Sequence, residues 1–357
     1  MNFRIPYEGN LTWIPERTIL FGRHGSHAYG LAIETSDEDW KGVAIPPRQY
    51  FHGFNERFEQ AESKEPDLVI YDLRKFMALA ADCNPNIIEI LWSEQQLCTR
   101  LGERLVAARR LFLSRKAKHT FSGYAIAQLK RIRTHYRWIK SPQKQPPSRA
   151  DFDLPERTVI PKDQLAAAQA AIEKKLATWD LDFVDDATPD TRILLKSKMA
   201  ELLAEMKITS EERWASAARS IGYDENFLLL LDRERRYGAQ QREWEQYQNW
   251  KATRNPKRAS LEEKHGYDTK HAMHLVRLMR MCREIMTTGE VIVKRPDREE
   301  LLAIRGGAWS YDQLVAWADK EDIELEALYK TSEALPRAPD RAALDQLCIE
   351  LVEESLR

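Results

Sequence analysis

The pattern of apolar residues changes near residue 100, and this change limits the possible fold more than any other feature of the sequence. Three short β-prone runs precede it, at Thr18–Phe21, Trp40–Ile45 and Leu68–Tyr71; the first stops at Gly22 and the second at Pro46. Short apolar runs bounded by glycine and proline are typical of buried strands. Because short helical patterns are mixed with these runs, we predict an α+β fold for the N-terminal part.

Helical spacing dominates the remainder of the chain. A first helix is predicted from Leu73 to the Asn84-Pro85 pair, and a further apolar segment runs from Ile87 to Trp92. Five prolines between residues 141 and 162 interrupt the helical pattern and predict a linker or exposed loop. Beyond residue 100 we predict helices at about 101–114, 119–140, 163–178, 190–205, 225–250 and 268–287.

The length of 357 residues and the 43% share of hydrophobic residues allow a substantial core and about two domains. No apolar run approaches the roughly 20 residues that a membrane span needs, and no export signal begins the chain, so we expect a soluble protein without a membrane partner. The four cysteines form no CxxC pair, which argues against zinc and favours a reducing cytoplasm. They are Cys83, Cys98, Cys282 and Cys348.

Charge is distributed very unevenly along the chain. Residues 1–100 hold 10 Lys/Arg against 15 Asp/Glu, whereas residues 101–150 hold 13 Lys/Arg and one acidic residue, Glu103. Such a basic segment predicts contact with a polyanion, nucleic acid or a triphosphate, although a solvated helix face is an alternative. Its apolar and aromatic residues fall mainly at spacings of three and four, which more often indicates a core stripe, so the prediction rests on charge and not on the aromatic rings. The stripe comprises Phe121, Tyr124, Leu129, Ile132 and Tyr136.

A Gly-Ser pair follows the first predicted strand, and an Asp-x-Asp motif follows eleven residues later. Gly25 and Ser26 are expected to begin a helix, where free backbone N–H groups and a hydroxyl can bind the oxygens of a triphosphate. Asp37 and Asp39 are two residues apart, so on an extended strand both carboxylates point to one face while Glu38 points away. Hard oxygen ligands of this kind suit Mg²⁺ or Mn²⁺.

Two-metal phosphoryl transfer commonly uses a third carboxylate on a neighbouring strand. Asp67 directly precedes the third predicted strand and is the preferred candidate. Asp72 is the alternative, although its position before Leu73 is well explained as a helix N-cap. The predicted catalytic and metal-binding set is therefore Asp37, Asp39 and Asp67.

Together these motifs resemble the nucleotidyltransferases of the RNA-repair-pathway DNA-polymerase-beta family. The resemblance is carried by residues 25–31, 36–43, 71–76, 84–86, 89–92, 266–278 and 302–307, and residues 145–250 look more variable. It implies a polymerase-beta-type nucleotidyltransferase core at 1–100, a mixed sheet backed by helices. A mainly α-helical C-terminal domain at 101–357 would follow, with a variable insertion at about 141–255.

The resemblance also implies an activity. The protein is expected to transfer a nucleoside monophosphate from a nucleoside triphosphate to an acceptor hydroxyl and to release pyrophosphate. The family name and the basic 101–150 segment favour RNA as the acceptor. A protein or small-molecule acceptor is the first alternative, and a nucleotide-binding adaptor without catalysis is the second.

A polar stripe on the predicted helix 268–287 is a candidate partner of this site. Lys270, His274 and Arg277 are spaced by four and three residues and so share one helix face. Lys270 resembles the basic residue with which related transferases bind the incoming triphosphate, and His274 and Arg277 could assist. Ordinary surface cations are an equally good explanation. His271 and His274 have a metal-ligand spacing, but no flanking carboxylate completes such a site.

Overall fold

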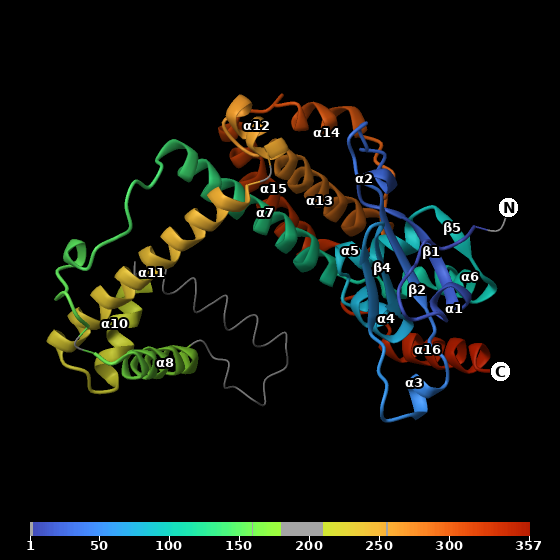
Figure 1. Ribbon diagram of the computed structural model, residues 1–357, viewed down its shortest axis with the longest axis horizontal. Helices are drawn as coiled ribbons and strands as arrows, with labels where there is room; N and C mark the ends of the chain where they lie inside the picture. Colours follow the sequence, from blue (N-terminus) through green and yellow to red (C-terminus); the bar gives the residue numbers. More distant parts are fainter. Residues whose placement is uncertain (1–2, 159, 180–209, 255) are drawn as a thin grey trace. The chain divides into compact units, whose positions relative to one another are not determined.

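The structure is a computed structural model that describes residues 3–158, 160–179, 210–254 and 256–357 (Figure 1). The chain divides into two compact units. The first unit combines Met1–Ser141 with Asn255–Arg357, and the second is Pro142–Arg254. The segment predicted to be a variable insertion therefore coincides closely with the second unit, while residues 101–141 pack with the N-terminal part in the first.

A mixed five-stranded sheet forms the N-terminal part of the first unit. Its strand order is β3-β4-β2-β1-β5, in which β2 and β4 are parallel and the other neighbouring pairs are antiparallel. The strands are β1 (Thr18–His24), β2 (Asp39–Ala44), β3 (Gln60–Lys64), β4 (Asp67–Asp72) and β5 (Gln95–Cys98). The sheet followed by helices confirms the predicted α+β class.

The three predicted strands form the centre of the sheet, and the two strands that were not predicted form its edges. β1 continues past Gly22 to His24, two residues beyond the expected stop. The edge strands have few apolar residues because only one of their sides pairs with a neighbour, so their sequences lack a strand signal. The apolar segment Ile87–Trp92 is helical and spans part of α5 (Pro85–Ile88) and η1 (Glu89–Trp92).

Helices make up most of the remaining described chain, as predicted. Those of the first unit are α1 (Ile14–Arg17), α2 (Gly25–Ala28), α3 (Gln49–His52), α4 (Leu73–Ala81), α6 (Arg100–Ala107), η2 (Arg109–Phe112), α7 (Lys116–Lys140), α12 (Pro256–His265), α13 (Thr269–Thr288), α14 (Arg298–Arg305), α15 (Tyr311–Thr331) and α16 (Arg341–Ser355). The helix predicted at 190–205 lies outside the described residues.

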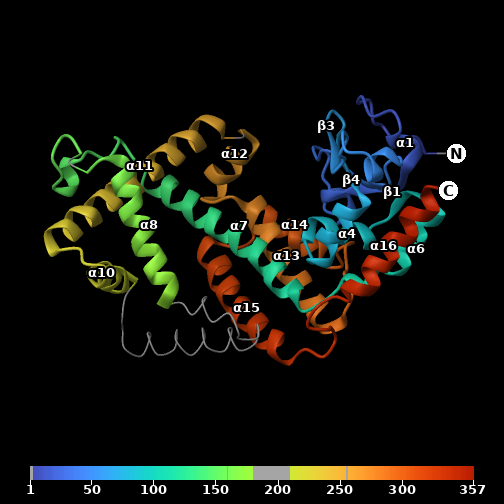
Figure 2. The same ribbon diagram turned by 90° about the horizontal axis from the view of Figure 1, so that it is seen from below.

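Helices α7 and α13 lie side by side and form the centre of the helical part of the first unit (Figure 2). Phe121, Leu129 and Ile132 of α7 are buried there and Tyr136 is partly buried, which confirms the predicted core stripe at these positions. Tyr124 is exposed, so the stripe does not include it. One apolar cluster joins these helices to the sheet residues Leu20 and Val43. The helices after residue 255 thus share a core with the N-terminal sheet, and this shared core holds α13 beside the sheet.

The second unit is described on its own. The described part of its proline-rich loop contains the short helix η3 (Ala150–Phe152). The helices described after this loop are α8 (Lys162–Trp179), α10 (Ser210–Ser220) and α11 (Glu225–Thr253). Its small apolar core includes Ile172 and Leu231. Of the helices that the structure describes in either unit, none is long and apolar enough to cross a bilayer.

Candidate active site

Two aspartates face each other at one end of the central strands. Because β2 and β4 are parallel and in register, Asp39 and Asp67 begin the two strands as direct neighbours. Asp39 is half-buried and Asp67 is exposed. Burial raises the pKa of Asp39, and the negative charges of Asp67 and Asp37 raise it further, while Lys41 and Lys270 oppose this shift.

Asp37 lies two residues before β2, so the strand geometry expected for the Asp-x-Asp motif begins only at its second aspartate. The Asp37 side chain is exposed and near enough to influence Asp39 electrostatically. Glu38 instead pairs with Arg23 at 3.1 Å. Among the described residues, no group of three or more His, Cys, Asp and Glu side chains is already arranged around a metal position.

The predicted Gly-Ser turn lies directly against Asp39. His24 is the last residue of β1 and pairs with Asp39, and α2 begins at Gly25 as the sequence predicts. Gly25 has a φ of +60°, and a Cβ atom built there would lie 1.9 Å from Asp39 Oδ2. Only glycine can therefore bring the backbone this close to the carboxylate.

Replacing Gly25 with alanine is expected to displace the Asp39 carboxylate and to destabilise the turn. The left-handed backbone alone costs about 1–2 kcal/mol for a residue with a Cβ atom, before the clash is counted. Thermal unfolding measures the effect on stability, and a nucleotide-transfer assay measures the effect on the site.

Gly123→Ala is the matched control, because a Cβ atom at Gly123 meets nothing within 4 Å. Since Gly123 lies within α7, alanine is expected to raise the stability slightly there. Equal behaviour of the two variants would contradict the close approach of Gly25 to Asp39.

A cavity of about 490 Å³ opens beside these residues. Its walls come from the sheet, from the start of α5 and from the facing helices α7 and α13. The lining residues are His24, Gly25, Tyr29, Asp39, Trp40, Lys41, Asp67, Val69, Asn86, Tyr124, Gln128, His271, His274, Arg277 and Leu278. The cavity therefore gathers Gly25, Asp39, Asp67, His274 and Arg277 of the predicted site, while Asp37, Ser26 and Lys270 are not among its lining residues.

Arg277 is buried, which distinguishes it from the surface cation considered for this position. Its Nη1 lies 3.2 Å from Glu89 Oε1, and its guanidinium lies 3.6 Å from the centre of the Tyr29 ring. The Tyr29 hydroxyl donates a hydrogen bond to the other Glu89 oxygen. Glu89 is fully buried, so this pair neutralises charges that would be costly alone. These contacts fix the Arg277 side chain of α13 against Tyr29, in the segment that follows Gly25.

Lys270 and His274 are half-buried on the same side of α13. Lys270 is near enough to Asp39 to lower the pKa of that carboxyl, and His274 lines the cavity. His271 has other partners, because its Nδ1 lies 2.5 Å from Asp268 and its Nε2 accepts from Arg131 at 3.2 Å. The structure thus gives His271 a role in joining α13 to α7.

Asp72, the alternative third carboxylate, caps helix α4. Its side chain accepts hydrogen bonds from the backbone N–H groups of Arg74 and Lys75 and pairs with the Arg74 guanidinium at 3.0 Å. Only 2% of Asp72 is exposed. The N-cap role is therefore confirmed, and Asp72 lies at the end of β4 opposite to Asp67.

Sequence reasoning missed Lys41, Tyr29 and Glu89. Lys41 follows Asp39 by two residues on β2, so the alternation of a strand places both side chains on one face. Burial lowers the pKa of Lys41 to about 8, although Glu89, Asp39 and Asp67 oppose this shift. Glu89 had a signal as well, since it is a single carboxylate within the apolar run Ile87–Trp92. A lone acid in such a run has to find a buried partner.

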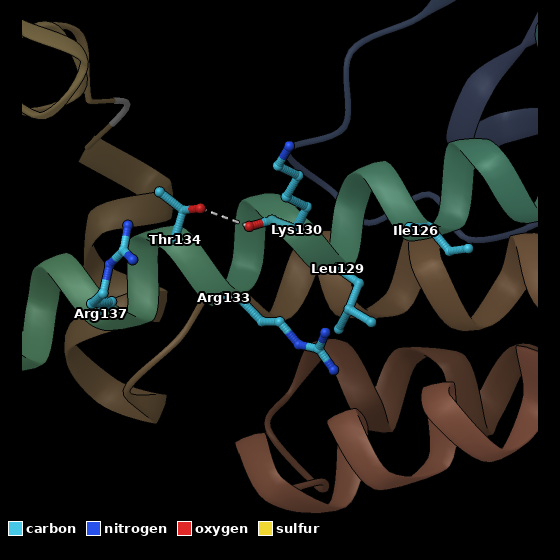
Figure 3. Close-up of a pocket in the computed structure, with 6 residues that line it drawn as sticks. All are labelled: Ile126, Leu129, Lys130, Arg133, Thr134 and Arg137. Carbon is cyan, nitrogen blue, oxygen red and sulfur yellow. Dashed lines mark hydrogen bonds between the residues drawn. The ribbon is translucent and has the colours of Figure 1, made fainter. Parts of the chain in front are cut away.

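Many cations of the predicted basic segment are neutralised inside the first unit. Lys116 pairs with Asp82 at 2.7 Å, Arg133 pairs with Asp319 at 2.9 Å, and Lys118 pairs with Glu326. Lys130 is exposed, and no carboxylate of the described chain pairs with it. It borders a second cavity, of about 310 Å³, on α7 (Figure 3).

Figure 3 shows the Lys130 ammonium and the Arg133 guanidinium pointing away from α7 in different directions. Leu129, Ile126, Thr134 and Arg137 complete the lining of this cavity. The positive charge of the segment is therefore partly structural, and Lys130 is its clearest exposed cation.

The mixed sheet, the glycine turn beside paired aspartates and the helical wall opposite them agree with the polymerase-beta-type core that the sequence resemblance predicts. In a comparison with protein families, residues 11–149 match the model of RlaP, the RNA repair pathway DNA polymerase beta family. The match confirms the predicted resemblance over this segment, which contains the sheet and α7. The family name describes a polymerase-beta-like protein of an RNA repair pathway. Searches among curated proteins and solved structures gave no match.

Proposed function

We propose that this protein transfers a nucleoside monophosphate from a nucleoside triphosphate to a hydroxyl group of RNA and releases pyrophosphate. The observation that carries the proposal is the register of β2 and β4, which brings Asp39 and Asp67 together beside Gly25. In the reaction, the acceptor oxygen forms a bond to the α-phosphorus. The bond from that phosphorus to the bridging oxygen breaks, the acceptor hydroxyl loses its proton, and pyrophosphate leaves.

The carboxylates fit a divalent cation by their charge and donor type. Repulsion from Asp67 and Asp37 contributes to the raised pKa of Asp39, and a cation bound between these groups would relieve it. Asp37, Asp39 and Asp67 would hold Mg²⁺ or Mn²⁺ through their oxygens. Such an ion supplies charge neutralisation for the phosphates and makes the acceptor hydroxyl easier to deprotonate.

The remaining residues of the site bind and orient the donor. The backbone N–H groups of Gly25 and Ser26 would donate hydrogen bonds to the phosphates, and Gly25 allows this backbone to lie close to Asp39. Lys270 and His274 add positive charge or hydrogen-bond donors from α13. Arg277 lines the cavity while Glu89 holds its guanidinium in place, so it can donate a hydrogen bond to the ligand without moving toward it. Fixed groups of this kind orient the α-phosphate for attack with little reorganisation.

The acceptor is tested by supplying each labelled nucleoside triphosphate with Mg²⁺ or Mn²⁺ and a pool of small RNAs. The control is a variant with both Asp37→Ala and Asp39→Ala. Label on RNA that requires these aspartates supports the proposal and identifies the donor. Label on the protein itself would redirect the proposal to a protein acceptor. Nucleotide binding without transfer under either metal would indicate a non-catalytic adaptor.

Lys130 is expected to contribute to RNA binding through phosphate contact. Replacing it with alanine should weaken the binding of single-stranded RNA and reduce the slope of log affinity against log salt by about 0.7. Fluorescence anisotropy at several salt concentrations measures this slope. Lys174→Ala on α8 removes another exposed lysine and serves as the control. The same slope for the wild type and Lys130→Ala would exclude a phosphate contact at Lys130.

A further inference from the structure

Lys41 extends from the sheet into the cavity that holds the two aspartates. On β2 it follows Asp39 by two residues, and it pairs with Val69 of β4 in the same way that Asp39 pairs with Asp67. Its Nζ donates a hydrogen bond of 2.8 Å to the backbone carbonyl of Asn86 at the start of α5. The ammonium is therefore held at a defined position in the cavity, across from α7 and α13.

The Lys41 and Arg277 side chains differ in their ion-pair partners. Arg277 lies 3.2 Å from the buried Glu89 carboxylate, whereas no carboxylate of the described residues lies within 4 Å of the Lys41 ammonium. A lysine ammonium has three N–H donors, and the Asn86 carbonyl accepts from one of them. The other two donors face the cavity, where a ligand with acceptor oxygens can replace the water that would otherwise bind them.

We propose that Lys41 binds the phosphates of the donor nucleotide, an inference that rests on the proposed nucleotidyl transfer. The ligand must be anionic, because the unused donors need acceptors and the ammonium lacks a close counter-charge. It must also reach Asp39 and Asp67, because both share the cavity with Lys41. A triphosphate meets both conditions. Lys41 then acts as a fixed phosphate ligand on the sheet, in addition to the cations that α13 supplies.

Binding measurements separate a phosphate contact from a structural role. Isothermal titration calorimetry with Mg²⁺ is carried out for the four nucleosides, their monophosphates and their non-hydrolysable α,β-methylene triphosphates. Lys41→Met removes the charge but keeps an unbranched side chain, and Lys41→Arg keeps the charge. Lys330→Met on α15 is the control, because Lys330 is exposed in the same unit and does not line this cavity.

Lys41→Met is expected to weaken triphosphate binding about 10- to 100-fold, the loss typical of a hydrogen bond to a charged group. Nucleoside binding should not change, Lys41→Arg should recover part of the affinity, and Lys330→Met should match the wild type. Unchanged triphosphate binding, or an equal loss for nucleosides, would overturn the role of Lys41. If the wild type bound no nucleotide, the proposed function itself would fail. Thermal unfolding of Lys41→Met and Lys41→Arg identifies any loss that arises from misfolding.

Discussion

Replacing Asp67 with alanine is expected to lower the rate of nucleotide transfer by about a thousandfold and to leave stability almost unchanged. On the proposed function, the rate should fall because a carboxylate that holds a catalytic metal ion contributes several kcal/mol to transition-state stabilisation. Stability should change by less than about 0.5 kcal/mol because the Asp67 side chain is exposed. Loss of its charge also removes repulsion from Asp39. Single-turnover transfer and thermal unfolding measure the two quantities.

The matched variant Asp72→Ala should have the opposite effects. Alanine cannot accept the hydrogen bonds that begin α4, so the loss of the N-cap is expected to cost about 0.5–2 kcal/mol. Transfer by the folded fraction should remain near the wild-type rate, because Asp72 lies at the other end of β4. If Asp72→Ala abolished transfer while Asp67→Ala did not, the assignment of the third carboxylate would be reversed.

The buried pair of Glu89 and Arg277 should produce the largest changes in stability. Arg277→Met leaves the Glu89 carboxylate buried without its cation, and we expect the free energy of unfolding to fall by about 3–5 kcal/mol. Glu89→Gln leaves the guanidinium without its counter-charge and should also destabilise. In the double variant, the free energy of unfolding should fall by less than the sum of the two single losses, since neither charge then remains alone.

Urea unfolding of the wild type, both single variants and the double variant gives the interaction energy directly. A control with Arg280→Met removes a half-buried arginine of the same helix that pairs with Asp297 and Glu300. Because those partners remain accessible to water, the loss should be smaller. Additive losses for Glu89 and Arg277 would show that the two side chains stabilise the fold independently.

The extent to which the sequence predicts this fold depends on burial. The central strands carry apolar residues on both faces and were predicted, whereas the edge strands Gln60–Lys64 and Gln95–Cys98 carry mainly polar ones. Their formation depends on backbone pairing with a neighbour already in place, and this pairing leaves little trace in side-chain pattern. Helices are easier to predict from the sequence, because their periodic apolar face appears within a single stretch of chain.

The candidate site shows the same division between local and long-range information. The glycine turn and the aspartates form local patterns. Gly25 begins a helix, and Asp39 and Asp67 begin neighbouring strands as the sequence predicts, whereas Asp37 lies before β2 and outside the predicted strand geometry. Helical spacing predicted that Arg277 shares a polar face with Lys270 and His274, but it gave no sign that the Arg277 side chain is buried at the cavity. Its partner Glu89 is 188 residues away in the chain. Sequence spacing predicts which face a residue occupies, and only the tertiary fold determines what it meets there.

Because the first unit is interrupted by residues 142–254, its cavity cannot be completed early in protein synthesis. The ribosome makes the sheet and α7 first, and more than a hundred residues of the second unit precede α13. At about 5–20 residues per second, this interval lasts roughly 6 to 23 seconds. During it, Glu89 lacks Arg277 and the apolar side of α7 lacks its main neighbour. The nascent N-terminal segment is therefore expected to need protection from aggregation, and nucleotide transfer should begin only after α13 has docked.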